Sequence, residues 1–64
     1  MNYFLAKNDK ELGLCLRMLF AEGFDALHVE SVETEKKRLV FHINVEMDAE
    51  LFARLQKRYS LLIS

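Results

Sequence analysis

Two histidines are the first residues whose chemistry draws attention, because imidazole nitrogens bind divalent transition metals. His28 and His42 lie in two neighbouring strand-like runs, and a hairpin with a loop at 34–36 would place them opposite each other, with Glu30 beside them. The alternative is a solvated sheet face on which polar residues simply alternate with buried ones. We favour that alternative because the spacing is unspecific. We therefore expect no cofactor.

Cys15 is the only cysteine of the chain. A catalytic thiol needs a base beside it, and both histidines belong to strands on the face that we place away from the helices. Free cysteine is among the residue types most often buried. We interpret Cys15 as a core residue, and its unpaired state as a sign of a reducing, cytoplasmic setting.

Two neighbouring carboxylates, Asp48 and Glu50, suggest acid–base chemistry at first sight. Asp48 is well placed as the N-cap of a helix, and Glu50 can pair with Arg54 one turn later, so both have structural roles. The sequence contains no glycine-rich phosphate loop and no metalloprotease helix motif. We therefore predict that the protein is not an enzyme.

Basic residues form two groups that raise the alternative of nucleic-acid binding. The net charge of −1 gives little attraction to phosphate, and Phe41 is expected to point toward the helices rather than stack on a base. RNA or DNA binding is thus a third alternative and membrane binding is not expected. The basic residues are Lys36, Lys37 and Arg38 at the expected hairpin tip, and Arg54, Lys57 and Arg58 on the last helix.

Length and composition describe one small folded domain over residues 1–64. The chain is 52% hydrophobic and 30% charged, with the charges too interspersed for a membrane span. Charge is divided along the chain, since residues 1–35 hold three basic and seven acidic side chains and residues 36–64 hold six and three. Such a dipolar molecule can attract copies of itself or a partner with a matching patch.

The first half of the chain reads as a strand followed by a helix. The apolar run 3–6 predicts a strand, and Asn8 with Glu11 can cap a helix over 9–22 that stops at Gly23. The helical spacing predicts a core stripe of Leu12, Cys15, Leu16, Leu19 and Phe20. It leaves Leu14, Met18 and Ala21 on another side as a second apolar patch.

The second half reads as a β-hairpin followed by a helix. The runs 27–33 and 38–46 are rich in β-formers, and directly opposed residues must share a face, which requires a loop with an odd number of residues. Asp48 caps a helix that we expect to run to about Tyr59. For the apolar tail 60–64 we favour a short fourth strand over an extension of the helix.

The summed order β-α-β-β-α, with a closing strand, predicts an α+β domain of the ferredoxin-like split βαβ type, with two helices on one face of an antiparallel sheet. The segments 20–24 and 45–50, FAEGF and VEMDAE, flank the expected hairpin. In this respect the chain resembles small ACT-like and P-II-like regulatory modules, and is most similar to the family of prokaryotic signal-transducing proteins. That resemblance implies a regulatory role.

Apolar surface is the remaining signal. A chain of this length usually needs additional stabilisation from a disulfide, a metal or a partner subunit. With one cysteine and no expected metal site, a partner is the remaining source. Either Tyr3 with Leu5 or Phe4 with Ala6 is expected on the uncovered side of the sheet, next to Val40. On the first helix, Leu14 and Met18 are equally compatible with an interface and with ordinary scattered exposure. We predict a non-catalytic interaction or regulatory module of bacterial or phage type, acting as a homodimer or on a protein partner, with inhibition of a host enzyme as one form. A metal or small-ligand sensor on the sheet face is the alternative.

Overall fold

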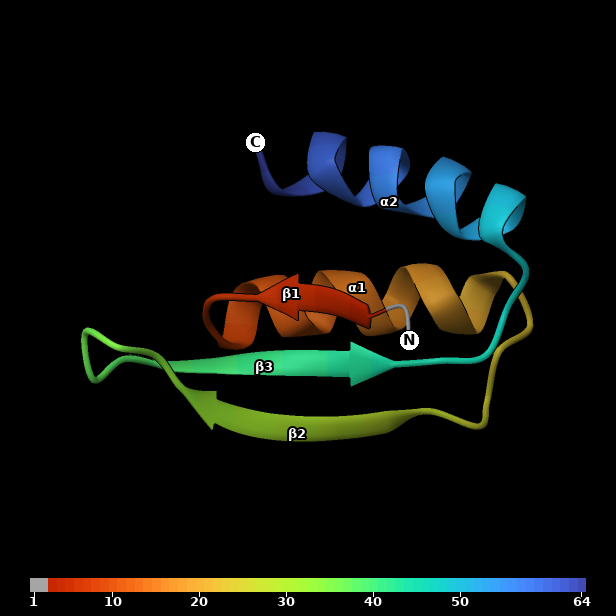
Figure 1. The fold of residues 1–64 in the computed structure, drawn as a ribbon. Helices are drawn as coiled ribbons and strands as arrows, with labels where there is room; N and C mark the ends of the chain where they lie inside the picture. The colour runs from red at the N-terminus through yellow and green to blue at the C-terminus, as the bar shows by residue number, and fades with distance from the viewer. Residues whose placement is uncertain (1–2) are drawn as a thin grey trace.

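The computed structural model describes residues 3–64. Strand β1 (Tyr3–Ala6) leads into helix α1 (Asp9–Ala21), strands β2 (His28–Glu33) and β3 (Leu39–Asn44) form a hairpin, and helix α2 (Ala49–Ile63) closes the chain (Figure 1). This confirms the predicted α+β class and the order β-α-β-β-α. None of the described helices is both long and apolar enough to cross a membrane.

The three strands form one antiparallel sheet in the order β1-β3-β2. The hairpin loop has the predicted odd length, but it lies at 35–37 because Thr34 pairs with Arg38. The backbone N–H of Thr34 donates to the Arg38 carbonyl at 2.8 Å, and the N–H of Arg38 donates to the Thr34 hydroxyl at 3.2 Å. Lys37 completes the turn with a left-handed φ of 60°. The predicted faces therefore hold, while the pairing is displaced by two residues.

Both ends of α1 are capped as the sequence indicates. The Asn8 side chain accepts a 2.9 Å hydrogen bond from the Glu11 N–H, while the Glu11 carboxylate turns back to the N–H of Lys7. At the other end Gly23 has a φ of +91°, which glycine adopts without strain. The N–H groups of Gly23 and Phe24 then donate to the carbonyls of Phe20 and Leu19, the pattern of a Schellman stop.

The tail is helical, so the expected fourth strand is wrong. Asp48 caps α2 by accepting a 2.8 Å bond from the Leu51 N–H, and the helix then continues through Ile63. Leu55, Tyr59 and Ile63 follow one another at four-residue spacing, so the extension prolongs the apolar stripe of the helix. A return strand would need a turn after Tyr59, and the tail has neither glycine nor proline to make one.

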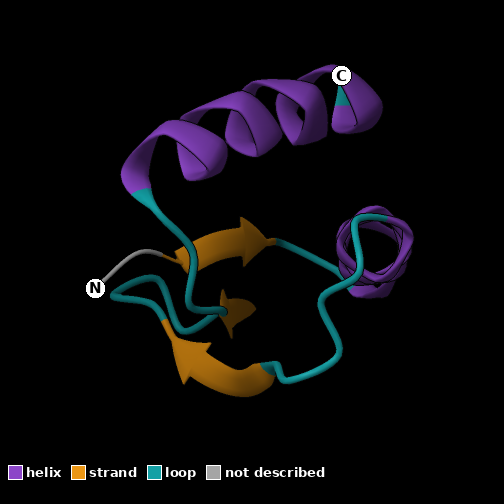
Figure 2. Cartoon of the chain, turned by 90° about the vertical axis from the view of Figure 1, so that its right-hand side faces the viewer, coloured by secondary structure: helices purple, strands orange, loops and turns teal. Residues whose placement is uncertain are grey.

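The two helices cover the sheet unequally. Helix α1 lies on one face, whereas α2 crosses above the β1 border, its first turn projecting on the side away from α1 (Figure 2). This differs from the expected placement of two helices flat on one face. The core that they enclose consists of Phe4, Ala6, Cys15, Met18, Leu19, Ile43, Val45, Leu55 and Tyr59.

The structure selects one of the two faces left open for the first strand, and it corrects two positions on α1. Phe4 is fully buried because it faces the helices, where its ring packs against Phe52 and Tyr59. Met18 is buried because α2 packs against that side of α1. Phe20, assigned to the core stripe, is 56% exposed because it lies on the flank of the stripe. Phe4 and Met18 are therefore core residues rather than surface residues.

Candidate interaction surfaces

One face of the sheet carries no helix (Figures 1 and 2). Phe4 and Ile43 point toward the helices. Strand alternation and the observed register therefore place the residues that precede and follow them in their strands on this uncovered face. Tyr3 and Leu5 of the edge strand β1 are 44% and 39% exposed there. The uncovered face comprises Tyr3, Leu5, His28, Glu30, Val32, Val40, His42 and Asn44.

An aromatic pair on this face joins β1 to β3. The rings of Tyr3 and His42 stack with centroids 4.1 Å apart and planes inclined by 16°. His42 lies directly opposite Leu5 and therefore diagonally from Tyr3, a distance that aromatic side chains can span. Sequence reasoning missed this pair because it requires β3 to lie beside β1. The split βαβ order, which predicts that adjacency, was the signal that could have revealed it.

The histidines do share the uncovered face, but they are not opposite each other. In the observed register His42 opposes Glu30 and His28 opposes Asn44, so the predicted direct His28–His42 pair is wrong. The cause is the displaced loop, which shifts β2 by two positions against β3. Across residues 3–64, no three His, Cys, Asp or Glu side chains gather closely enough to hold a metal ion.

The predicted surface residues separate into two places. Tyr3 and the half-buried Val40 belong to the uncovered face. Leu14 is half-buried on α1, where it lines a shallow groove of about 300 Å³ together with Arg58 and Leu62 of α2. The exposed apolar surface predicted on α1 is therefore smaller than expected, and the sheet face carries the larger share.

The basic residues do not form one surface. Lys36, Lys37 and Arg38 are exposed at the hairpin tip, which lies far from α2 in Figure 1. On α2, Arg58 lies 3.7 Å from the Glu22 carboxylate, and this is the one ion pair within residues 3–64. The predicted Glu50–Arg54 pair is absent from the described structure. A continuous basic track for a nucleic-acid backbone is thus not assembled.

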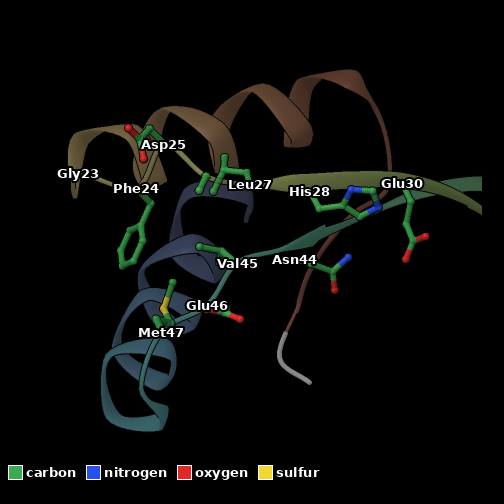
Figure 3. A pocket seen from close by; sticks show the side chains of 11 residues that line it. Gly23, Phe24, Asp25, Leu27, His28, Glu30, Asn44, Val45, Glu46 and Met47 are labelled. Carbon is green, nitrogen blue, oxygen red and sulfur yellow. The ribbon is translucent and has the colours of Figure 1, made fainter.

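A cleft opens at the end of the sheet where β2 begins and β3 ends (Figure 3). Its volume is about 1440 Å³, and it lies between the α1–β2 loop and the β3–α2 connection. Phe24, Leu27, Val45 and Met47 supply its apolar lining. Asp25, Glu30 and Glu46 supply carboxylates, His28 and Asn44 supply neutral polar groups, and no Lys or Arg lines it.

Two titratable groups are buried away from these surfaces. Burial raises the pKa of the Cys15 thiol to about 12, and it raises the pKa of Tyr59 to about 12 with smaller contributions from nearby Cys15 and Glu11. Cys15 is fully buried, which confirms its predicted place in the core. A protonated thiol is a poor nucleophile, so the geometry offers no reactive cysteine.

The chain matches no protein-family model, no curated protein and no solved structure. Its function is therefore inferred from the uncovered face, the hairpin tip and the cleft alone.

Proposed function

We propose that this chain is a small non-catalytic interaction module that works as a homodimer, whose subunits meet through the uncovered sheet face. The observation that carries the proposal is the cluster of Tyr3, Leu5 and the stacked His42 on a sheet face that no helix covers. Strand order and element order support a ferredoxin-like split βαβ fold without its fourth strand. In such a fold the helix-free face is the natural one for association.

The large accessible surface area of the chain supports association with a partner. The accessible surface of the chain is 4887 Å², whereas a compact monomer of this mass would expose about 4,200 Å². The excess fits a molecule whose helices protect only one side of its sheet. A second copy would remove this apolar surface from water, which stabilises both chains by roughly 25 cal/mol for each Å² of apolar area.

Symmetry favours a second copy of the chain as the partner. A twofold axis through the Tyr3 and Leu5 patch of the uncovered face brings this patch of both subunits together, so apolar side chains meet apolar side chains. A standard interface buries about 800 Å² per partner, about one sixth of this surface. The face of the three strands alone is too narrow to bury this area. The projecting first turn of α2 enlarges the surface available for contact (Figure 2).

The experiment is analytical ultracentrifugation of the wild type and two leucine variants at about 500 mM NaCl, where contacts between exposed charges are screened. We expect a dimer for the wild type and a folded monomer for Leu5→Lys. Leu61→Lys is the matched control, because Leu61 is 71% exposed on α2 and outside the uncovered face. The proposal fails if the wild type stays monomeric at high concentration, or if both substitutions dissociate the dimer equally.

A further inference from the structure

We infer a second contact between copies of this chain, in which the hairpin tip of one copy enters the acidic cleft of the next. The cleft shares His28, Glu30 and Asn44 with the uncovered face, but neither the cleft nor the tip includes Tyr3 or Leu5, so the contact goes beyond the proposed dimer. The two surfaces lie at opposite ends of the β2–β3 ribbon (Figure 1). Six strand residues separate them by about 20 Å, so a tip cannot reach the cleft of its own chain.

The cleft combines an apolar lining with negative charge. Phe24 and Met47 lie near each other with Val45 beside them, Glu46 and Asp25 lie on either side of this apolar part, and Glu30 lies farther along the cleft beyond His28 (Figure 3). These carboxylates have no ion-pair partner in the described part of the chain, whose single ion pair joins Glu22 to Arg58. The cleft therefore suits a bulky apolar side chain with cationic neighbours.

The hairpin tip has that chemistry. Lys36, Lys37 and Arg38 are consecutive and exposed, against one acidic residue, Glu35. Leu39 follows them and is 65% exposed, more than any other apolar side chain of the described strands. None of the three cations has an ion-pair partner within residues 3–64. An apolar anchor thus stands beside three positive charges, complementary to the cleft.

The tip is ordered before it binds. Thr34 fixes the loop through two hydrogen bonds with Arg38 and a third, at 2.9 Å, in which the Thr34 carbonyl accepts from the Lys37 N–H. A preformed loop loses little conformational entropy on docking.

Tip and cleft are different surfaces, so the contact is head-to-tail. Such contacts generate rings or open chains rather than closed pairs. Because the attraction is largely between exposed charges, it should be strong at about 50 mM NaCl and weak at about 500 mM NaCl. The sheet-face contact, being apolar, should respond little to the same change.

A mixing experiment tests the contact in the Leu5→Lys background, where the sheet-face dimer is removed. The tip variant replaces Lys36, Lys37 and Arg38 by Gln, and the cleft variant carries Asp25→Asn, Glu30→Gln and Glu46→Gln. At low salt we expect the Leu5→Lys parent to self-associate and each variant to associate about tenfold more weakly. Mixed together, the two variants should form a 1:1 complex that grows no further, because one intact cleft meets one intact tip.

Controls separate this result from general charge effects and from misfolding. Arg54→Gln with Lys57→Gln removes two exposed cations from α2 and should leave association unchanged. Circular dichroism establishes that each variant is folded. A Leu5→Lys parent that remains monomeric at low salt, or a mixture that forms no 1:1 complex, would overturn the head-to-tail contact. Neither result would affect the sheet-face dimer, which is measured at high salt in the wild type.

Discussion

The hydroxyl of Tyr59 donates a 2.7 Å hydrogen bond to the backbone carbonyl of Leu5 and so joins two elements 54 residues apart in the sequence. The bond connects α2 to β1 at the border of the sheet that faces away from β3 (Figure 1). A fourth strand of a split βαβ sheet would pair at this border. Tyr59 instead provides a single polar contact there, while its ring packs edge-on against Phe4 at 5.9 Å.

Tyr59→Phe should therefore destabilise the fold while leaving its packing intact. The substitution leaves the Leu5 carbonyl without its partner, and we expect a loss of about 1–2 kcal/mol in the free energy of unfolding, measured by urea denaturation. Tyr3→Phe is the matched control, because Tyr3 is 44% exposed and its ring keeps the stack on His42. Equal effects of the two substitutions would contradict the assigned role of the Tyr59 hydroxyl.

Lys37→Gly should stabilise the hairpin. Lys37 has a left-handed φ of 60°, which costs an ordinary residue about 1 kcal/mol and costs glycine nothing. After the greater flexibility of glycine in the unfolded chain is subtracted, a net gain of about 0.5 kcal/mol is expected. Lys36→Gly is the control at the neighbouring loop position, and it should not stabilise. Thermal unfolding followed by circular dichroism measures both, and a lower Tm for Lys37→Gly would show that the turn is not strained.

The hairpin also shows how far the sequence could predict the fold. Alternation along β3 correctly placed Phe41 and Ile43 toward the helices, because period-two patterns depend only on local residue types. The exact pairing was out of reach, since a loop without glycine or asparagine gives no signal for its turn. Nothing in the sequence indicated that a lysine would adopt the left-handed conformation. A two-residue displacement preserves the faces but changes which side chains are opposite each other, so the His28–His42 pair was predicted and the Tyr3–His42 pair was missed.

The predictions for the tail 60–64 and for Met18 were wrong for a different reason. Whether residues 60–64 continue α2 depends on where that helix lies over the sheet, and whether Met18 is buried depends on α2 packing against α1. Both are tertiary properties that helical periodicity does not contain. Capping was predictable, since Asn8, Gly23 and Asp48 act on backbone groups a few residues away. The cleft was missed because its walls come from two separate connections.

The Tyr3–His42 stack should contribute measurable coupling to stability. Aromatic pairs of this geometry contribute about 0.5–1.5 kcal/mol beyond the area that they bury. A double-mutant cycle with Tyr3→Ala and His42→Ala, measured by urea denaturation at about 500 mM NaCl in the Leu5→Lys background, should return a coupling within this range. A cycle pairing Tyr3→Ala with Leu61→Ala provides the control, and its coupling should be near zero. A null result in the first cycle would mean that the rings are neighbours without mutual stabilisation.

The buried thiol predicts how stability changes in alkaline solution. Burial raises the pKa of Cys15 from 9.0 in the unfolded chain to about 12 in the folded one, so above pH 9.0 the folded chain retains a proton that the unfolded chain releases. The stability that this proton provides is complete below pH 9.0 and is lost as the pH rises toward about 12. The pKa of Tyr59 is raised from 10.0 to about 12 by burial and then by Cys15 and Glu11, which adds a loss of stability of the same sign above pH 10.0.

Urea denaturation at rising pH should show the unfolding free energy falling by roughly 1 kcal/mol per pH unit above pH 9.0. Cys15→Ala should be less stable at neutral pH, because it leaves a cavity, yet its stability should stay level until Tyr59 begins to titrate. An unchanged slope between pH 9.0 and 10.0 in Cys15→Ala would show that another group causes the loss.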